Sequence, residues 1–429
     1  MDIQTCHLPS HGKREVSFDI DEEKVISVLQ LKDKNYVEIK DVKKELFKSL
    51  NNPLSFNPLK KIIKEAKPKN AVVIVEDITR ANPYYPEILS SLLSYFPEKL
   101  RKNTIFLIAL GTHRPHSKSD NIRVYGEYLV RKCKFVNHNC DEGNEYIGTT
   151  SFGNRIFVNK IALECDLLIV TGSIDTHSFA GYSGTRKSIL PGIASRESIT
   201  FNHSFVVDVN SNMGSVEENK LHLDMFEAAE KFIEVRKPKQ TFFINFIKNH
   251  KKQLIKILSG SMEAVHKKGV QIARKLFSVP IKLKSDLTIV SCGGYPRDIN
   301  LYQAQKSLTC ASLATKVGGT IILVAECCEG VGQEVFAKWL IKKSISRILN
   351  TPQEKIVVEA HRAYLTAKLL KDYDCILVSD MDKKLVKRLK FRYAEDIKDA
   401  IEYVRSKYND RFDCYIIPNG SSVLPCYKK

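Results

Sequence analysis

Residues 175–203 bring together side chains that can perform acid–base and metal chemistry. This stretch, DTHSFAGYSGTRKSILPGIASRESITFNH, contains two histidines, one lysine and two arginines. It follows the apolar run CDLLIV (165–170), which predicts a buried strand, so the polar cluster begins where that strand ends. Gly181, Gly184 and Gly192 suit positions where the backbone bends sharply or approaches a ligand. We therefore expect a functional site here.

Polar side chains also follow three other apolar runs that predict buried strands. AVVIV leads into EDITR, TIFLIAL into GTHRPH, and LTIVS into CGGYPRDINLYQAQK. In open α/β sheets, ligands bind beyond the carboxyl ends of parallel strands. Together with residues 175–203, these strand ends predict one composite site.

Five segments give a more specific signal. They are EDITR (76–80), GTHRP (111–115), DTHSFAGYSGTRKSILPGI (175–193), NH (202–203) and GGYPRDINLYQAQKSL (293–308). In this order they resemble the motifs of the nickel-pincer-nucleotide lactate racemase family. The resemblance implies two α/β domains with mainly parallel sheets that face each other across an active-site cleft. It also implies an isomerase, namely a racemase or epimerase of a 2-hydroxy acid.

The resemblance further implies a cofactor, the nickel-pincer nucleotide. This group is a pyridinium-3-thioamide-5-thiocarboxylic acid mononucleotide that holds nickel through two sulfur atoms and one carbon. By position, Lys187 would attach the group covalently and His203 would ligate the nickel. The other implied cofactor contacts are Asp77, Tyr182, Ser183 and Gly184. The enzymes that synthesise the cofactor would be partners during maturation.

By the same resemblance, His113 and His177 would be the two catalytic bases. The implied substrate contacts are Arg80, Gln303, Lys306 and His361. The chemistry also explains these residue types. A base takes the hydroxyl proton while hydride leaves carbon 2, and hydride then returns to the opposite face of a planar 2-keto acid. Two enantiomers need two bases, and imidazole titrates near neutral pH. Arg80 and Lys306 could clamp the carboxylate.

Without the resemblance, several of these residues have an ordinary structural explanation. Asp77 could cap a helix that follows the AVVIV strand. His113 could be a turn residue. Gln303 and Lys306, three positions apart, could share a solvated helix face. We expect the histidines without an assigned role to be structural or surface residues.

Two of the departures from the family pattern bear on the turn before Lys187 and on the substrate. Thr185 stands where the family usually has a second glycine. In EAHRAYLTAKLL (359–370), His361 stands where lactate racemase has a tryptophan near the substrate. Imidazole is smaller than indole and can form hydrogen bonds. We therefore expect a substrate that is larger or more polar than lactate.

The pattern along the chain predicts two domains. From Asn70 onward, short apolar runs alternate with helical stretches, which is typical of α/β folds with parallel strands. Residues 214–282 have a largely helical pattern, and 279–286 suit a domain junction. We predict an N-terminal domain of residues 1–278, joined by 414–429, and a C-terminal domain of residues 284–413.

Two other functions need to be considered, and the net charge of +18 raises the first of them, nucleic-acid binding. The basic runs at 60–69, 248–256 and 383–392 are lysine-rich with helix-type apolar spacing, which indicates solvated helix faces. No basic stretch is interleaved with aromatic residues, so nucleic-acid binding is not expected. A nicotinamide-type oxidoreductase is the other alternative, but no glycine-rich dinucleotide fingerprint follows an early strand. A basic field could still attract an anionic substrate.

The cysteines and the apolar runs predict a cytoplasmic protein. The eleven cysteines include no C-x-x-C spacing, which favours reduced thiols over disulfides or a structural zinc site. No apolar run reaches the length of a membrane helix, and the first residues lack the apolar segment of a secretory signal.

Overall fold

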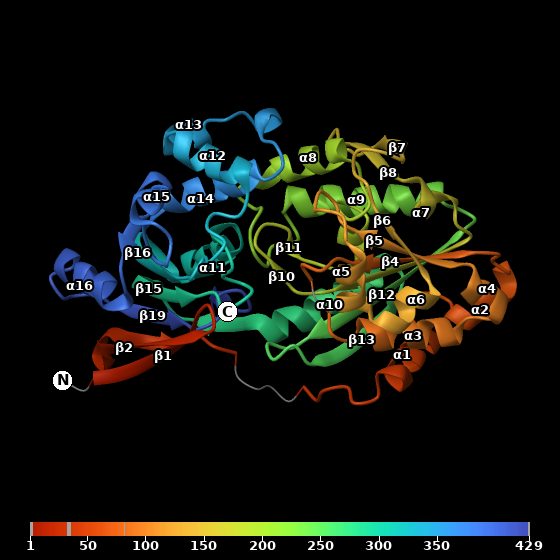
Figure 1. The fold of residues 1–429 in the computed structure, drawn as a ribbon, viewed down its shortest axis with the longest axis horizontal. Coiled ribbons are helices and arrows are strands. Elements are labelled where there is room, and N and C mark those ends of the chain that lie inside the picture. The colour runs from red at the N-terminus through yellow and green to blue at the C-terminus, as the bar shows by residue number, and fades with distance from the viewer. Residues whose placement is uncertain (1–2, 32–35, 81, 428–429) are drawn as a thin grey trace. The chain divides into compact units, whose positions relative to one another are not determined.

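The computed structural model of residues 1–429 describes residues 3–31, 36–80 and 82–427. The chain divides into two compact units (Figure 1). One unit comprises residues 33–276, and the other comprises residues 1–32 together with 277–429. Each unit is built on its own six-stranded sheet.

The sheet of the 33–276 unit has the strand order β13-β12-β9-β4-β5-β6. The strands are β4 (Ala71–Glu76), β5 (Thr104–Ala109), β6 (Lys134–Asn137), β9 (Leu167–Ser173), β12 (Gln240–Lys248) and β13 (Leu254–Gly260). All neighbours are parallel except β12 and β13, which are antiparallel. Strands β4 and β9 are buried at every position, which explains their continuous apolar sequences.

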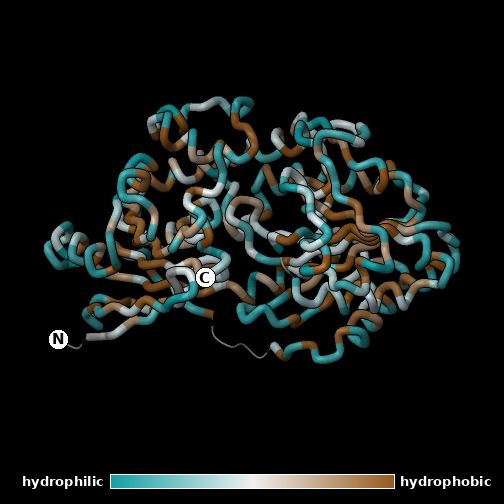
Figure 2. Tube along the Cα trace, viewed as in Figure 1, coloured by the Kyte–Doolittle hydropathy of each residue, from teal (hydrophilic) through white to brown (hydrophobic). Residues whose placement is uncertain are grey.

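Helices surround this sheet and complete its core. They are α1 (Val42–Asn51), α2 (Leu59–Ala66), α3 (Tyr85–Tyr95), α4 (Glu98–Lys102), α5 (Lys118–Tyr125), α6 (Glu127–Lys132), α7 (Lys160–Glu164), α8 (Arg196–Ser204), α9 (Lys220–Val235) and α10 (Met262–Phe277). Two short pairs, β7 (Asn144–Thr149) with β8 (Arg155–Asn159) and β10 (Thr176–His177) with β11 (Gly181–Tyr182), lie outside it. Hydrophobic residues concentrate on the central strands, as Figure 2 shows.

The second sheet has the order β18-β17-β16-β15-β19-β3, and all of its neighbouring strands are parallel. Its strands are β3 (Val25–Val28), β15 (Ser285–Ser291), β16 (Thr315–Val324), β17 (Asp374–Val378), β18 (Arg392–Ala394) and β19 (Cys414–Ile417). The helices of this unit are α11 (Leu301–Ala314), α12 (Glu334–Lys342), α13 (Ile345–Leu349), α14 (Ala360–Asp372), α15 (Lys383–Arg388) and α16 (Ile397–Lys407). The hairpin β1 (Ile3–His11) with β2 (Arg14–Asp21) and the pair β14 (Ser278–Ile281) with β20 (Leu424–Tyr427) belong to it as well.

The α/β class and the mainly parallel sheets confirm the prediction from sequence, but the unit boundaries differ from it. We expected residues 1–32 and 414–429 to join the N-terminal domain. Instead, β19 pairs with β15 and β3 pairs with β19, so both segments complete the C-terminal sheet. The N-terminal unit therefore begins near residue 33.

The prediction that residues 214–282 are largely helical is only partly right. Helices α9 and α10 are present, but TFFINFIK between them forms β12 and pairs with β9. The basic run 248–256 consequently spans the end of β12, a turn and the start of β13, and it is not a helix face. The runs at 60–69 and 383–392 do begin in helices, α2 and α15.

Candidate active site

The site begins where the order of the first sheet reverses. From β4 the chain adds β5 and β6 on one side of β4, and then places β9 and β12 on the other. Ligands in open α/β sheets bind at such a point, beyond the carboxyl ends of the strands. The ends of β4 and β9 are joined here, because the Glu76 carboxylate accepts hydrogen bonds from the Ser173 backbone N–H (2.9 Å) and hydroxyl (2.8 Å).

His113 and Asp77, which follow neighbouring strands, form a hydrogen-bonded pair. His113 Nδ1 lies 2.5 Å from Asp77 Oδ2, and Thr79 donates to Asp77 Oδ1 through its backbone N–H and its hydroxyl. Burial alone would raise the pKa of Asp77, but His113, Thr79 and Arg80 outweigh it and hold that pKa below its usual range. The Asp77 carboxylate therefore accepts a hydrogen bond from the Nδ1–H group of His113. This leaves Nε2 as the proton acceptor of a His113 side chain that is 53% exposed.

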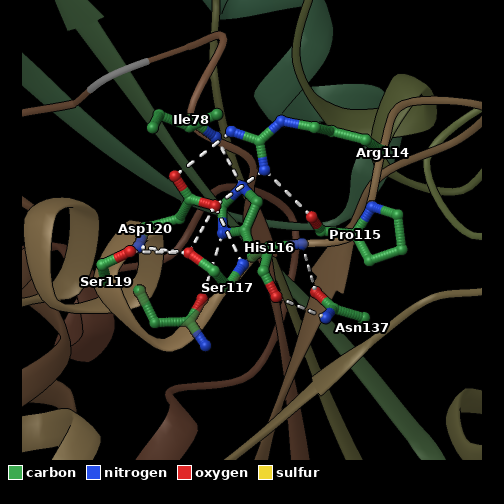
Figure 3. A network of polar contacts seen from close by, with 9 residues as sticks. Ile78, Arg114, Pro115, His116, Ser117, Ser119, Asp120 and Asn137 are labelled. Carbon is green, nitrogen blue, oxygen red and sulfur yellow. Dashed lines mark hydrogen bonds and ion pairs between the residues drawn. The ribbon is translucent and has the colours of Figure 1, made fainter.

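His116 joins the loop that follows β5 to the loop that follows β4, through its hydrogen bond to Ile78 (Figure 3). It is buried, and its Nε2 accepts the backbone N–H of Ile78 at 2.9 Å. Its Nδ1 lies 3.0 Å from Asn121 Oδ1, and its backbone N–H donates to Asn137. The expectation that His116 is structural fits these contacts, since both ring nitrogens are engaged by protein groups.

Lys187 lies on a short 3₁₀ turn, Thr185–Ser188, beside His177. The Lys187 amine is 3.4 Å from His177 Nε2. On the other side of the ring, His177 Nδ1 accepts the backbone N–H of Ala180 at 3.2 Å. With Nδ1 as an acceptor, a neutral His177 ring carries its proton on Nε2, a position toward which a Lys187 ammonium would also donate.

His203 is connected to this group through an aromatic ring. The Phe179 ring contacts His177 edge-on at 4.6 Å between centroids and His203 edge-on at 5.6 Å. His203 lies in the last turn of α8 and is 8% exposed. Lys187, His177 and His203 are therefore linked by one chain of contacts that passes through Phe179, and their action on a single bound group stays a prediction.

The turn between β11 and Lys187 depends on two left-handed residues. Gly184 has φ +83°, and a Cβ there would lie 2.5 Å from Ile174 Cγ1, so glycine is required. Thr185 also has a positive φ, +44°, which is unusual for a residue with a branched side chain. Its hydroxyl lies 3.0 Å from His266 Nδ1, and this hydrogen bond helps to hold Thr185 where the family usually has glycine.

Tyr182 and Ser183, predicted to bind the cofactor, are both buried within the protein. The Ser183 hydroxyl donates to the Ser173 carbonyl (2.7 Å) and accepts the Asp175 N–H (2.9 Å). This hydroxyl therefore fastens the turn to the end of β9. Their contact with a cofactor remains a prediction.

The other predicted substrate residues belong to the second unit. Gln303 and Lys306 share one face of α11, and the Lys306 amine donates to Gln303 Oε1 at 2.8 Å. His361 begins α14 and is 4% exposed, so it does not face solvent. The next residue, Arg362, is also buried, donates to the Tyr302 carbonyl at 3.0 Å and stacks over the Tyr302 ring.

Two family models match most of the chain. The lactate racemase N-terminal domain matches residues 11–214, and the lactate racemase C-terminal domain matches residues 281–425. The chain belongs to the lactate racemase family. Within it, the chain is 34% identical over 427 residues to a lactate racemase from Lactiplantibacillus plantarum, covering 96% of this chain and 98% of the relative. A lactate racemase from Thermoanaerobacterium thermosaccharolyticum is 32% identical over 424 residues, covering 96% and 97%.

Solved structures agree with this assignment. The lactate racemase apoprotein from Thermoanaerobacterium thermosaccharolyticum matches with a TM-score of 0.89 and 31% identity, covering 99% of this chain and all of that one. A protein from Thermotoga maritima shares the fold, with a TM-score of 0.67 at 19% identity. This family member is accordingly an isomerase of the racemase type. Within the described residues, no helix has both the length and the apolar character to cross a membrane.

One further basic residue, Lys248, lies at the end of a strand and is not predicted from the sequence. Lys248 ends β12, and burial lowers its pKa, while Glu76 and Asp175 oppose that shift. We had assigned Lys248 to a solvated basic run. The signal was present in the run TFFINFI, whose aromatic and β-branched residues favour a strand ending at Lys248.

Proposed function

We propose that this protein inverts carbon 2 of a 2-hydroxy acid, using a nickel-pincer nucleotide attached to Lys187. The main support is that two histidines of the site have opposite hydrogen-bonding roles at Nε2: one Nε2 can accept a proton and the other can donate one. His113 offers an unprotonated Nε2 because its ring proton is on Nδ1, which donates a hydrogen bond to the Asp77 carboxylate. His177 offers a protonated Nε2 once the Lys187 amine is taken up in the cofactor link and no longer donates toward that atom, because its Nδ1 accepts a backbone N–H. One base and one acid are what a single inversion needs.

The residues present fit the proposed cofactor. Lys187 supplies an amine for the covalent link, and His203 supplies a buried imidazole, a ligand type that suits nickel. The proposed metal takes a single protein ligand, so it requires no cluster of metal-binding side chains. In the described residues, no three His, Cys, Asp or Glu side chains are grouped to hold a metal. When bound, the group supplies a hydride acceptor and donor for carbon 2.

In the proposed reaction, the histidines move the protons. His113 Nε2 takes the hydroxyl proton of one enantiomer while hydride leaves carbon 2, giving a planar 2-keto acid. After hydride returns to the opposite face, His177 Nε2–H donates its proton to the oxygen of the product. The reverse reaction exchanges these roles. Asp77 stabilises the charged His113 imidazole that forms along the way.

We propose that cationic and polar side chains hold the substrate. Arg80 lies close enough to Asp77 to lower the pKa of that carboxyl group. The planar Arg80 guanidinium could donate two parallel hydrogen bonds to a substrate carboxylate. Gln303 and Lys306, already hydrogen-bonded to each other, offer a second polar pair. Enzymes that synthesise the cofactor would mature the protein, and the cytoplasm remains the predicted location.

We further propose that the substrate is larger or more polar than lactate. His361 is buried beside Arg362, so this helix start presents imidazole and guanidinium groups to the protein interior. Lactate, malate, glycerate, phenyllactate and sugar acids should be compared by kcat/KM. A polar substrate should rank above lactate, and His361→Trp should shift the ranking toward lactate. Lactate ranking clearly first would refute this preference.

The hydride route is tested by racemising the preferred substrate in D₂O, with protein matured alongside the cofactor-synthesis enzymes. Internal hydride return predicts that the hydrogen on carbon 2 is largely retained. Direct deprotonation of carbon 2 would instead introduce deuterium from solvent. Complete exchange at carbon 2 would reject the proposed mechanism even if racemisation occurred.

A further inference from the structure

Asp224, on helix α9, is a buried carboxylate that three neutral groups hold in place. It is 0% exposed. Its Oδ1 accepts the Thr150 hydroxyl at 2.6 Å, and its Oδ2 accepts the side-chain amides of Asn154 and Asn202, each at 2.8 Å. In the part of the chain that the structure describes, no lysine or arginine forms an ion pair with it. A buried carboxylate held in this way is a costly feature that calls for an explanation.

Two of these contacts reach helix α8, which ends one residue after His203. Asn202 donates to Asp224 and also to the Leu221 carbonyl at 3.0 Å, so its amide is held by α9 alone. Asn154, held by the same carboxylate oxygen, donates to the Ser198 carbonyl at 3.2 Å. The first and last turns of α8 are thus both fastened to Asp224, and the residue next to Asn202 is His203.

We propose that Asp224 is a positioning residue for His203: through Asn202 it fixes the last turn of α8 so that the imidazole is held ready for a metal ion. This proposal rests on the proposed function, in which His203 ligates nickel. The physical reason is geometric. A metal ligand must be held to within about 0.5 Å, and groups behind the ligand supply that restraint. Loss of the carboxylate would leave the amides of Asn202 and Asn154 without their shared acceptor in the interior.

Helix α9 offers a matched control. Glu227, one turn after Asp224, accepts hydrogen bonds from the backbone N–H (2.7 Å) and hydroxyl (2.6 Å) of Ser151. It therefore ties α9 to the same 150–154 segment. In the described residues it makes no hydrogen bond to α8. If the network acted only by holding the 150–154 segment, removal of either carboxylate would have the same effect on nickel.

The test uses matured protein with the substitutions Asp224→Ala, Asn202→Ala and Glu227→Ala. For each variant, mass spectrometry reports the cofactor on Lys187, and competition with a chelator reports how tightly nickel is retained. We expect Asp224→Ala and Asn202→Ala to keep the cofactor mass but to hold nickel about 10-fold to 100-fold more weakly. Glu227→Ala should match the unsubstituted protein.

The proposal is overturned if Asp224→Ala retains nickel normally, or if Glu227→Ala loses it to the same extent. If thermal unfolding shows that Asp224→Ala is not folded, Asn202→Ala decides, because it leaves Asp224 with two donors. His203→Ala separates the two proposals. If His203→Ala retains nickel, the proposed ligand is wrong; if it loses nickel while Asp224→Ala and Asn202→Ala do not, only the positioning role is wrong.

Discussion

Two groups of histidines in the 33–276 unit differ in solvent access and in the charge of the side chain beside them. His113 has a 53% exposed side chain and bonds to the Asp77 carboxylate. His222 and His266 are 6% and 5% exposed, and their rings stack at 5.3 Å beside the fully buried Arg186. Burial and the Arg186 charge lower the pKa of His222 to about 2 and also lower that of His266.

The difference shows how the surroundings divide one residue type between two tasks. His113 has a carboxylate to stabilise its charged form and solvent access for its free nitrogen, so it can exchange protons. The His222 and His266 pair stays neutral and supports the Lys187 turn through the bond from His266 to Thr185. Arg186, whose pKa burial lowers to about 9, adds support by donating to the carbonyls of Ala180 and Tyr182.

The largest expected effect comes from removing a catalytic imidazole. His113→Ala and His177→Ala should each lower kcat by roughly 10²-fold to 10⁴-fold, the usual contribution of a general acid or base. Steady-state kinetics on matured protein measures this, with nickel content and Lys187 mass as controls that should not change. A His113→Ala variant that lost nickel would mean that His113 is a ligand.

A smaller loss should follow from changing the partner of His113. Asp77→Asn keeps the shape but cannot stabilise a charged imidazole or select its Nδ1–H form. We expect kcat to fall about tenfold or more, which corresponds to about 1.4 kcal/mol. Steady-state kinetics measures the loss, and an unchanged kcat would show that the 2.5 Å contact has no catalytic role.

The neutral histidines should make stability sensitive to acid. Burial lowers the folded-state pKa of His138 to about 4 and that of His222 to about 2, against 6.5 for an ordinary histidine. The unfolded chain therefore binds protons first as pH falls below about 6.5, and stability should decline from there. Each such histidine contributes about 1.4 kcal/mol per pH unit. Urea unfolding between pH 7 and 5 measures the slope, and a flat profile would contradict this assignment.

The smallest expected effect concerns Thr185. Thr185→Ala loses the hydrogen bond to His266 and keeps the left-handed φ of +44°, so stability should fall by about 1 kcal/mol. Thr185→Gly loses the same bond but relieves the strain, so it should be close to neutral. Thermal unfolding compares the two. Equal losses would show that the backbone at Thr185 is unstrained.

Much of the fold follows from continuous apolar runs in the sequence. AVVIV, TIFLIAL and CDLLIV became β4, β5 and β9 because strands buried on both faces need no polar alternation. TFFINFIK was missed because the amphipathic helices α9 and α10 flank it. The pairing of β3 with β19 was also missed, since nothing local in either strand specifies a partner more than 380 residues away.

The contacts of the candidate site also fall into two kinds, those that the sequence predicts and those that depend on packing. The approach of His113 to Asp77 could be expected, because both follow adjacent parallel strands. The bond from Thr185 to His266 spans 81 residues and depends on how α10 packs, so residue types alone could not predict it. The Asp224 network joins three separate segments and has the same dependence on packing.

The most direct test of the proposed function is the mass of the peptide that contains Lys187. Protein matured with the cofactor-synthesis enzymes should gain the mass of the cofactor on that peptide, and Lys187→Ala should gain nothing and lose racemisation. A fully active protein with an unmodified Lys187, or with the added mass on another residue, would contradict the account.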